Sequence, residues 1–535
     1  MELVVSQMSP NSRIVLNILA TYGRTLVGVA CGIFSTRWVL MALGKEDFGL
    51  YGLIASLVIF MTFVNIQFAG ALSRYYAFAV GEAKAALDPT LALEECRKWF
   101  SIGVAIHVVV PLSLLAVGYP VGVWSIRSGL VGVPVYRTDA CVWLWRFVCI
   151  SSLISMLNVP FSAMYTAKQY IAELTIYSFS QTIAKTAFIY YMTLSKADWL
   201  VPYGLATCLI LVIPQLLICL RAFVVFPECR FRWRYIKLGS YTIKLASYAL
   251  WQTFGVLGYL ARHQFLTVVV NSFFGPKVTA SFTIGGTVSG EAASLTGALN
   301  TAFSPAITTA CGEGDWRRAR TMAYQACKYG TILTLIFAIP MGLEMPEILR
   351  LWLKDVPQWA NGVCLVMLAV VVIEKFTLGH LIGMNASGRI ALFQVCRGLS
   401  CLTAIPFGIV AALVFRHVYA VTLALLITTC IACCSDVLLA RTRIGLSARY
   451  WASRIILPLL FVSLISAVVG FSTRYFMAQS FLRVVVTTVF VLTMLIPTAV
   501  FFVLDHNERV FLIKKVCVLM KRFRRHNGNP GDILT

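Results

Sequence analysis

The most restrictive feature of this sequence is a series of fourteen apolar segments, each about twenty residues or longer, separated by short polar stretches. A helix of about 20 apolar residues spans the hydrocarbon core of a bilayer. Only 13% of the residues are charged and 59% are hydrophobic, whereas a soluble domain has about 25% charged residues. The sequence therefore predicts an all-α polytopic membrane protein with about fourteen transmembrane helices.

The predicted spans fall into two groups of six followed by a final pair. The first six lie near 14–42, 50–73, 100–124, 140–165, 170–194 and 199–224. The next six lie near 244–273, 278–310, 324–348, 359–384, 389–415 and 418–440, and the last two near 453–473 and 481–504.

The distribution of basic residues predicts the orientation of these spans. If the N-terminus is cytoplasmic, the cytoplasmic segments hold 29 Lys and Arg residues and the opposite side holds 10. Cytoplasmic loops of membrane proteins are enriched in Lys and Arg, and the bias never inverts along this chain. Both termini are therefore expected in the cytoplasm. The same loops account for the net charge of +23, so no nucleic-acid partner is expected.

An internal repeat relates the two groups of six. Shifting the chain by 231 residues aligns Gly44 with Gly275, and Gly81-Glu82 with Gly312-Glu313. The shift spans an even number of helices, which predicts two parallel six-helix lobes related by an axis along the membrane normal. The expected organisation is an N-terminal lobe at 1–225, a cytoplasmic linker at 226–243, a C-terminal lobe at 244–440, two additional helices within 441–505 and a basic cytoplasmic tail at 506–535. The apolar and basic residues of this tail alternate as in an interfacial amphipathic helix, although a plain charge anchor is an equal alternative.

Charged residues inside the predicted spans are the strongest indication of function. Each cation at the bilayer centre costs about 2.5–3.5 kcal/mol, so most must face water, pair with an acid or reach the interface. In the first span, Arg24 lies on a stripe of polar and small residues at helical spacing that includes Asn17 and Thr21. We expect this stripe to line an aqueous cavity, with structural pairing of the arginine as the alternative. The candidate substrate-binding residues are Arg24, Arg262, Asn17, Thr21, Arg146, Lys185 and Glu291.

Catalytic and metal-binding motifs are absent from the sequence. It contains no GxxxxGK[ST], HExxH or GxSxG motif, so no enzyme activity and no nucleotide site of the Walker A type are expected. Cys430, Cys433 and Cys434 lie within an apolar segment without further zinc ligands nearby. We expect no metal and no cofactor, and leave a coupling proton or sodium ion open.

The segment from Asn17 to Leu53 reads NIxxxYxR and, after twelve further residues, RxxLxxLGxxxxGLYGL. Together with the AlaLeuSerArgTyrTyr stretch that leads to Gly81-Glu82, it resembles the Wzx-type polysaccharide and O-antigen flippases of the multidrug/oligosaccharidyl-lipid/polysaccharide (MOP) exporter superfamily. The resemblance implies a MATE-like pair of lobes around a cavity, alternating access, and location in the bacterial inner membrane. The implied substrate is an undecaprenyl-diphosphate-linked glycan, with membrane lipids and polysaccharide polymerase or assembly proteins as further partners. Arg24 and Arg262 match the family's cationic cavity residues by helix position.

Two other functions are compatible with the sequence. A cation-coupled multidrug exporter of the same fold would need acidic residues in its cavity, whereas the first predicted span carries Arg24 and no acid. A scaffold for glycan assembly would not need charges inside its spans. Buried cations and polar walls favour an anionic, lipid-linked sugar substrate, because arginine binds phosphate in a bidentate manner.

Overall fold

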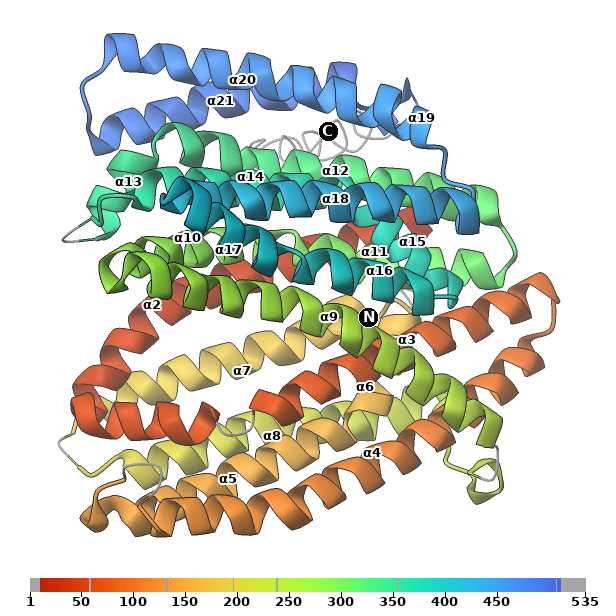
Figure 1. Ribbon diagram of the computed structural model, residues 1–535. Helices are drawn as coiled ribbons and strands as arrows, with labels where there is room; N and C mark the ends of the chain where they lie inside the picture. Colours follow the sequence, from red (N-terminus) through yellow and green to blue (C-terminus); the bar gives the residue numbers. More distant parts are fainter. Residues whose placement is uncertain are drawn as a thin grey trace, which may run out of the picture. The chain divides into compact units, whose positions relative to one another are not determined.

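The computed structural model describes residues 10–56, 59–129, 133–195, 197–236, 239–353, 356–506 and 508–510, and within these ranges all regular secondary structure is helical (Figure 1). The first half contains α2 (Pro10–Ser56), α3 (Ile59–Ala85), α4 (Pro89–Arg127), α5 (Thr138–Leu157), α6 (Val159–Ala167), α7 (Ile171–Met192) and α8 (Leu200–Val225). The second half contains α9 (Gly239–Phe274), α10 (Pro276–Leu295), α11 (Gly297–Gly312), α12 (Trp316–Leu343), α13 (Met345–Trp352), α14 (Ala360–Phe376), α15 (Leu378–Ser387), α16 (Ala391–Leu402), α17 (Ala404–Phe415), α18 (Val418–Ile444), α19 (Ala448–Trp451), α20 (Leu457–Phe476) and α21 (Phe481–Phe502).

Many of these helices are suited to a bilayer. Eight helices in the described ranges are long and apolar enough to span a membrane, and α14 with α15 makes a ninth if this pair, bent by 46°, counts as one span. The cavity-lining helix α7 is not among the eight, because Glu173, Gln181 and Lys185 interrupt its apolar surface. The all-α membrane fold is thus confirmed, while the count of fourteen spans stays a prediction.

Breaks between helices fall inside several of the predicted spans. The predicted spans 140–165, 278–310, 359–384 and 389–415 each contain a break, at Asn158, Thr296, Thr377 and Thr403 respectively. Residues of the predicted span 50–73 are helical wherever the structure describes them, and the helix is longer than predicted, since α3 continues to Ala85. Hydropathy reports burial in lipid and not helical backbone, so it misses the part of a helix that extends into the polar interface.

The chain forms two compact units that do not coincide with a simple division into halves. Unit 1 comprises residues 1–262, 297–323 and 380–402, and unit 2 comprises residues 263–296, 324–379 and 403–535. The lobes predicted at 1–225 and 244–440 therefore remain a prediction about symmetry, separate from these contact-based units.

Two repeat-related glycines have the same uncommon backbone conformation. Gly44 has φ 77° and ψ 172°, and Gly275 has φ 79° and ψ 177°. This region of backbone space is accessible essentially only to glycine. Each glycine precedes a new helical segment that leads into a long helix, α3 or α11, after a short interval. The internal repeat is thus supported by local geometry as well as by sequence.

Within unit 1, α3 and α11 cross at a second pair of repeat-related glycines. A Cβ atom built on Gly81 would lie 2.1 Å from the carbonyl oxygen of Thr309, and one on Gly312 would lie 2.2 Å from that of Phe78. Both distances are shorter than any van der Waals contact. The two helices therefore meet backbone to backbone near their C-terminal ends, and the reciprocal contact is what a parallel repeat produces.

Arg137, just before α5, links two turns of unit 1. Its Nη2 lies 2.8 Å from Oδ2 of Asp47, and its Nη1 lies 2.5 Å from Oδ2 of Asp198. The hydrogen bond from Arg137 holds the pKa of Asp198 below its ordinary value. At Asp47, burial outweighs the same arginine and raises the pKa of the carboxyl group. Arg137 thus connects the first helical turn after Gly44 to the residues that directly precede α8.

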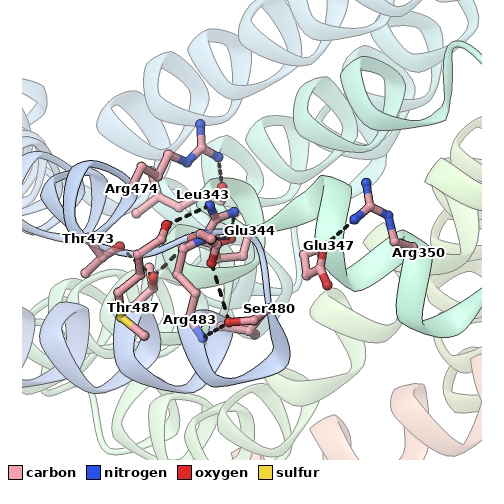
Figure 2. A network of polar contacts seen from close by, with 12 residues as sticks. Leu343, Glu344, Glu347, Arg350, Thr473, Arg474, Ser480, Arg483 and Thr487 are labelled. Atoms are coloured by element: carbon pink, nitrogen blue, oxygen red, sulfur yellow. Dashed lines mark hydrogen bonds and ion pairs between the residues drawn. The ribbon is translucent and has the colours of Figure 1, made fainter.

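Within unit 2, a buried ion pair fastens the two final helices to the end of α12. Glu344 is fully buried, and its Oε2 lies 2.7 Å from Nη2 of Arg483, which is only 6% exposed (Figure 2). The hydroxyl group of Thr487 donates to the other carboxylate oxygen at 3.0 Å and lies 2.7 Å from the hydroxyl group of Thr473. Both oxygens of the buried carboxylate are therefore satisfied by α21.

A second ion pair fastens α12 to the residues that follow α21. Lys328 is 1% exposed, and its Nζ lies 2.6 Å from Oδ2 of Asp505 and 3.2 Å from Oε2 of Glu508. Lys328 and Glu344 are separated along the chain by a helical length of roughly 24 Å at 1.5 Å per residue. The final helices α20 and α21 are thus held to α12 at two points, at Lys328 within this helix and at Glu344 directly after it. Of the predicted amphipathic tail at 506–535, residues 507 and 511–535 lie outside the described residues.

Candidate functional site

The polar stripe predicted on the first span faces α7. Asn17 anchors this contact, because its Nδ2 donates to the carbonyl oxygen of Gln169 at 3.1 Å and its Oδ1 accepts from the backbone N–H of Ala172 at 3.1 Å. Farther along α2, the hydroxyl groups of Ser35 and Thr186 lie 3.3 Å apart. Asn17 and Ser35 therefore join the two helices at both ends of the stripe.

A cavity of about 540 Å³ is lined by residues that lie between these two contacts along both helices. Its lining comes from α2, α7 and α8 and consists of Arg24, Thr25, Gly28, Ser178, Gln181, Thr182, Lys185, Thr207, Ile210 and Leu211. The volume lies within the range of small-molecule sites. Most of the lining residues carry a hydroxyl, amide or charged group, although the larger part of the lining surface is apolar.

A second cavity of about 290 Å³ shares Arg24, Ser178 and Gln181 with the first. It extends toward α6 and α11 and is lined in addition by Thr21, Asn158, Ser162, Thr166, Ile171, Leu174, Thr175, Tyr177, Gln215, Ile218 and Thr301. The two cavities thus form one polar region inside unit 1, with the Arg24 side chain contributing to both.

The charge of this region is positive. Neither Arg24 nor Lys185 has a hydrogen-bond or ion-pair partner among the described residues, and no acidic side chain belongs to the described lining. Glu173, the acid closest to this region along α7, is instead ion-paired with Arg221 of α8. Two cations without a neighbouring acid raise the local potential, and in a membrane-embedded site this favours a bound anion.

The other predicted site residues lie outside this lining. Asn17 contacts the backbone near α7, and Arg146 of α5 donates from Nε to the hydroxyl group of Tyr119 at 3.2 Å. Arg262 of α9 is 1% exposed and lies with its Cζ 4.8 Å from the ring centroid of Tyr259. Glu291 is exposed on α10.

The structure thus brings Thr21, Arg24 and Lys185 together and places Arg262 in neither cavity. The role of these residues in substrate binding stays a prediction.

Lys185 of α7 is a predicted site residue, but the polar helical face on which it lies was not predicted. Thr175, Ser178, Thr182 and Lys185 recur at intervals of three or four residues and therefore lie on one helical face. The spacing rule that identified the stripe on the first span would have found this one too. No group of three or more potential ligands with a metal-binding arrangement occurs in the ranges that the structure describes.

No protein-family model matches the sequence, and no curated protein matches it. Solved structures do match. A structure of MATE in the straight conformation has a TM-score of 0.67 at 15% identity and covers 82% of this chain and 97% of its own. A multidrug resistance MATE family transporter of the MOP superfamily, in an outward-facing conformation, has a TM-score of 0.65 at 16% identity and the same coverage.

A third similar structure is a MOP superfamily transporter from Pyrococcus furiosus, for which reverse polarity of the binding pocket suggests a different function. Its TM-score is 0.63 at 15% identity, and it too covers 82% of this chain and 97% of its own. Identities this low establish the fold alone. The chain has the fold of MATE and other MOP superfamily transporters.

Proposed function

We propose that this protein is a flippase that moves a polyprenyl-diphosphate-linked oligosaccharide across the bacterial inner membrane by alternating access. The fold of MOP superfamily transporters supports membrane export in general. The positive cavity beside α2 and α7 supports this particular substrate class.

The single observation that carries the proposal is the composition of that cavity. Arg24 and Lys185 supply positive charge without an acid in the described lining, and threonine, serine and glutamine side chains supply polar walls. A diphosphate requires cationic hydrogen-bond donors, and the planar guanidinium group of an arginine can donate two parallel hydrogen bonds to phosphate. The sugars require polar walls, while a polyprenyl chain can remain in the lipid.

The rival function is a cation-coupled multidrug exporter. The fold supports it equally, because two of the similar structures are MATE transporters. A site for cationic drugs needs carboxylates to offset the desolvation of a cation. The described lining of the two cavities contains none, which favours an anionic substrate. A pocket of reverse polarity has been noted in the similar transporter from Pyrococcus furiosus.

The test is transport by the purified full-length chain in proteoliposomes. We expect flipping of a fluorescent undecaprenyl-diphosphate oligosaccharide, measured by the access of an impermeant quencher, and no uptake of ethidium. Arg24→Ala and Lys185→Ala should each weaken substrate binding about ten- to a hundredfold, since a hydrogen bond to a charged group contributes about 1.5–3 kcal/mol. Arg24→Lys retains the charge but loses the bidentate geometry and should have the smaller effect.

The matched control is Arg37→Ala, which removes an exposed cation from the same helix, outside the lining of either cavity. It should leave flipping unchanged. Normal flipping by both Arg24→Ala and Lys185→Ala at normal membrane abundance would refute this site. Ethidium transport without lipid flipping would favour the multidrug exporter.

A further inference from the structure

A third polar cavity lies in unit 1 between α3, α4 and α9, away from Arg24. Its volume is about 500 Å³, and the residues that define its chemistry are Arg74, Tyr75, Glu82, Trp99, Tyr241 and Lys244. The basic residues around it belong to segments that the charge distribution assigns to the cytoplasmic side. The cavity is therefore expected at the side of the membrane from which a lipid-linked glycan would be taken up.

Three aromatic rings form one wall of this cavity. Tyr75 stacks on Trp99 with ring centroids 3.9 Å apart and an interplanar angle of 19°. The ring centroid of Tyr241 lies 4.6 Å from that of Trp99. Two hydrogen bonds hold these rings in place. The hydroxyl group of Tyr75 donates to the carbonyl oxygen of Lys244, and the hydroxyl group of Tyr241 donates to the carboxylate of Glu95. Trp99 is only 6% exposed. The aromatic wall is therefore preorganised.

The charged groups of the lining differ in how they are engaged. Arg74 donates to the carbonyl oxygens of Asn385 and Ala386, and Glu95 accepts from Lys98 at 2.5 Å. In contrast, the carboxylate of Glu82 and the ammonium group of Lys244 have no hydrogen-bond or ion-pair partner among the described residues. Glu82 is exposed, and its pKa is raised above the ordinary value by partial burial of the carboxyl group and by the neighbouring carboxylate of Glu95.

The lining offers an acceptor at Glu82 and a donor at Lys244 beside a flat aromatic surface. The lining contains two basic residues, Arg74 and Lys244, and two carboxylates, Glu82 and Glu95. With Lys98, which pairs with Glu95 from outside the lining, the charges sum to no more than one positive charge. A diphosphate or an organic cation would gain little from such a site. A pyranose fits it, because hydroxyl groups both donate and accept and because the C–H groups of one sugar face pack on an aromatic ring.

We propose that this cavity binds a neutral sugar unit of the lipid-linked glycan, apart from the cationic cavity that holds its diphosphate. The inference rests on the proposed function, since it assigns the glycan and the diphosphate of one substrate to two sites. Glu82 accepts hydrogen bonds from sugar hydroxyl groups, Lys244 donates to them, and the ring of Tyr241, which packs on the buried Trp99, supports the apolar face.

Saturation-transfer NMR on the full-length chain in lipid nanodiscs tests this. The probes are the methyl glycosides of N-acetylglucosamine, galactose, mannose and rhamnose, measured against tetraethylammonium and inorganic pyrophosphate. At least one glycoside should receive saturation from the protein at millimolar concentration. Glu82→Gln should raise its dissociation constant about three- to tenfold, because the amide keeps an acceptor oxygen and loses only the charge that strengthens the hydrogen bond. Tyr241→Leu should remove the transfer to the ring protons.

The control variant is Glu94→Gln, which neutralises an exposed carboxylate on the same helix as Trp99 outside the cavity lining. It should bind the glycosides as the parent chain does. Absence of glycoside binding, equal binding by Glu82→Gln, or preference for tetraethylammonium or pyrophosphate would each overturn the inference. Lipid flipping by a chain that fails this test would leave the proposed function standing, and glycoside binding without flipping would refute only that function.

Discussion

Arg24 and Arg262 occupy equivalent predicted positions but have different surroundings. Arg24 is exposed and lines both cavities beside α7, whereas Arg262 is 1% exposed and is the largest fully buried side chain of the described residues. A cation at a water-filled cavity pays little desolvation free energy, but a buried one depends on its immediate neighbours. Residues that look equivalent in sequence should therefore respond differently to substitution.

We expect Arg262→Ala to act mainly on stability. Removing a large, fully buried side chain should lower the free energy of unfolding by about 2–5 kcal/mol, because the surrounding side chains cannot fill the space. Membrane abundance and the thermal midpoint in detergent should fall for Arg262→Ala, while Arg24→Ala should keep both near the values of the parent chain. Normal abundance of Arg262→Ala with impaired flipping would instead support the original prediction that Arg262 contacts substrate.

At the scale of elements, the crossing of α3 and α11 depends on two glycines. Gly81→Val and Gly312→Val should each destabilise the protein by about 1–3 kcal/mol or more, because the new side chain would overlap backbone atoms that cannot rotate away. The comparison is Gly70→Ala, elsewhere on α3, where an added Cβ meets no atom within 4 Å. The thermal unfolding midpoint in detergent measures the stability of the two valine variants and of Gly70→Ala. A stable Gly81→Val variant would show that the helices can separate without cost.

The ion pair of Glu344 and Arg483 gives a second prediction about elements. Breaking a buried pair by removing one partner typically costs about 3–5 kcal/mol, so Arg483→Leu should strongly reduce abundance. The double variant Glu344→Leu with Arg483→Leu should be less destabilised than the sum of the single variants, since no charge is left uncompensated. Arg350→Ala is the matched control, because this arginine is 64% exposed beside Glu347 and should contribute about 1 kcal/mol or less. Additive effects in the double variant would exclude coupling between Glu344 and Arg483.

At the scale of the whole molecule, the charge bias predicts which ends of the helices face the cytoplasm. Single cysteines at Ser128 and Gln479 should react with an impermeant maleimide added outside the cell, and one at Ser240 should react only after permeabilisation. Gln479 is preferred to its neighbour Ser480, whose hydroxyl group caps α21. The parent chain supplies the background from its native cysteines. External labelling at Ser240 would contradict cytoplasmic termini.

The sequence by itself determined the features that depend on local properties of the chain. Apolar segments of bilayer length specified an all-helical membrane fold. The sequence repeat aligns Gly44 with Gly275, and these two glycines share one backbone conformation. The spacing along the first span identified the face that carries Thr21 and Arg24. Hydropathy, helical spacing and glycine's freedom at positive φ can all be read from a short stretch of sequence.

Only the tertiary structure decided which charges share an environment. Lys328 and Arg483 each lie near the end of a predicted span, where a cation could reach water, yet both are buried in ion pairs with acids far away in the sequence. Lys185 lies in the same cavity as Arg24 because α7 packs on α2. Glu173, also on α7, pairs with Arg221 and does not line that cavity. The free energy of a charge in a membrane protein depends on its partners and on access to water, and both are set by which helices meet.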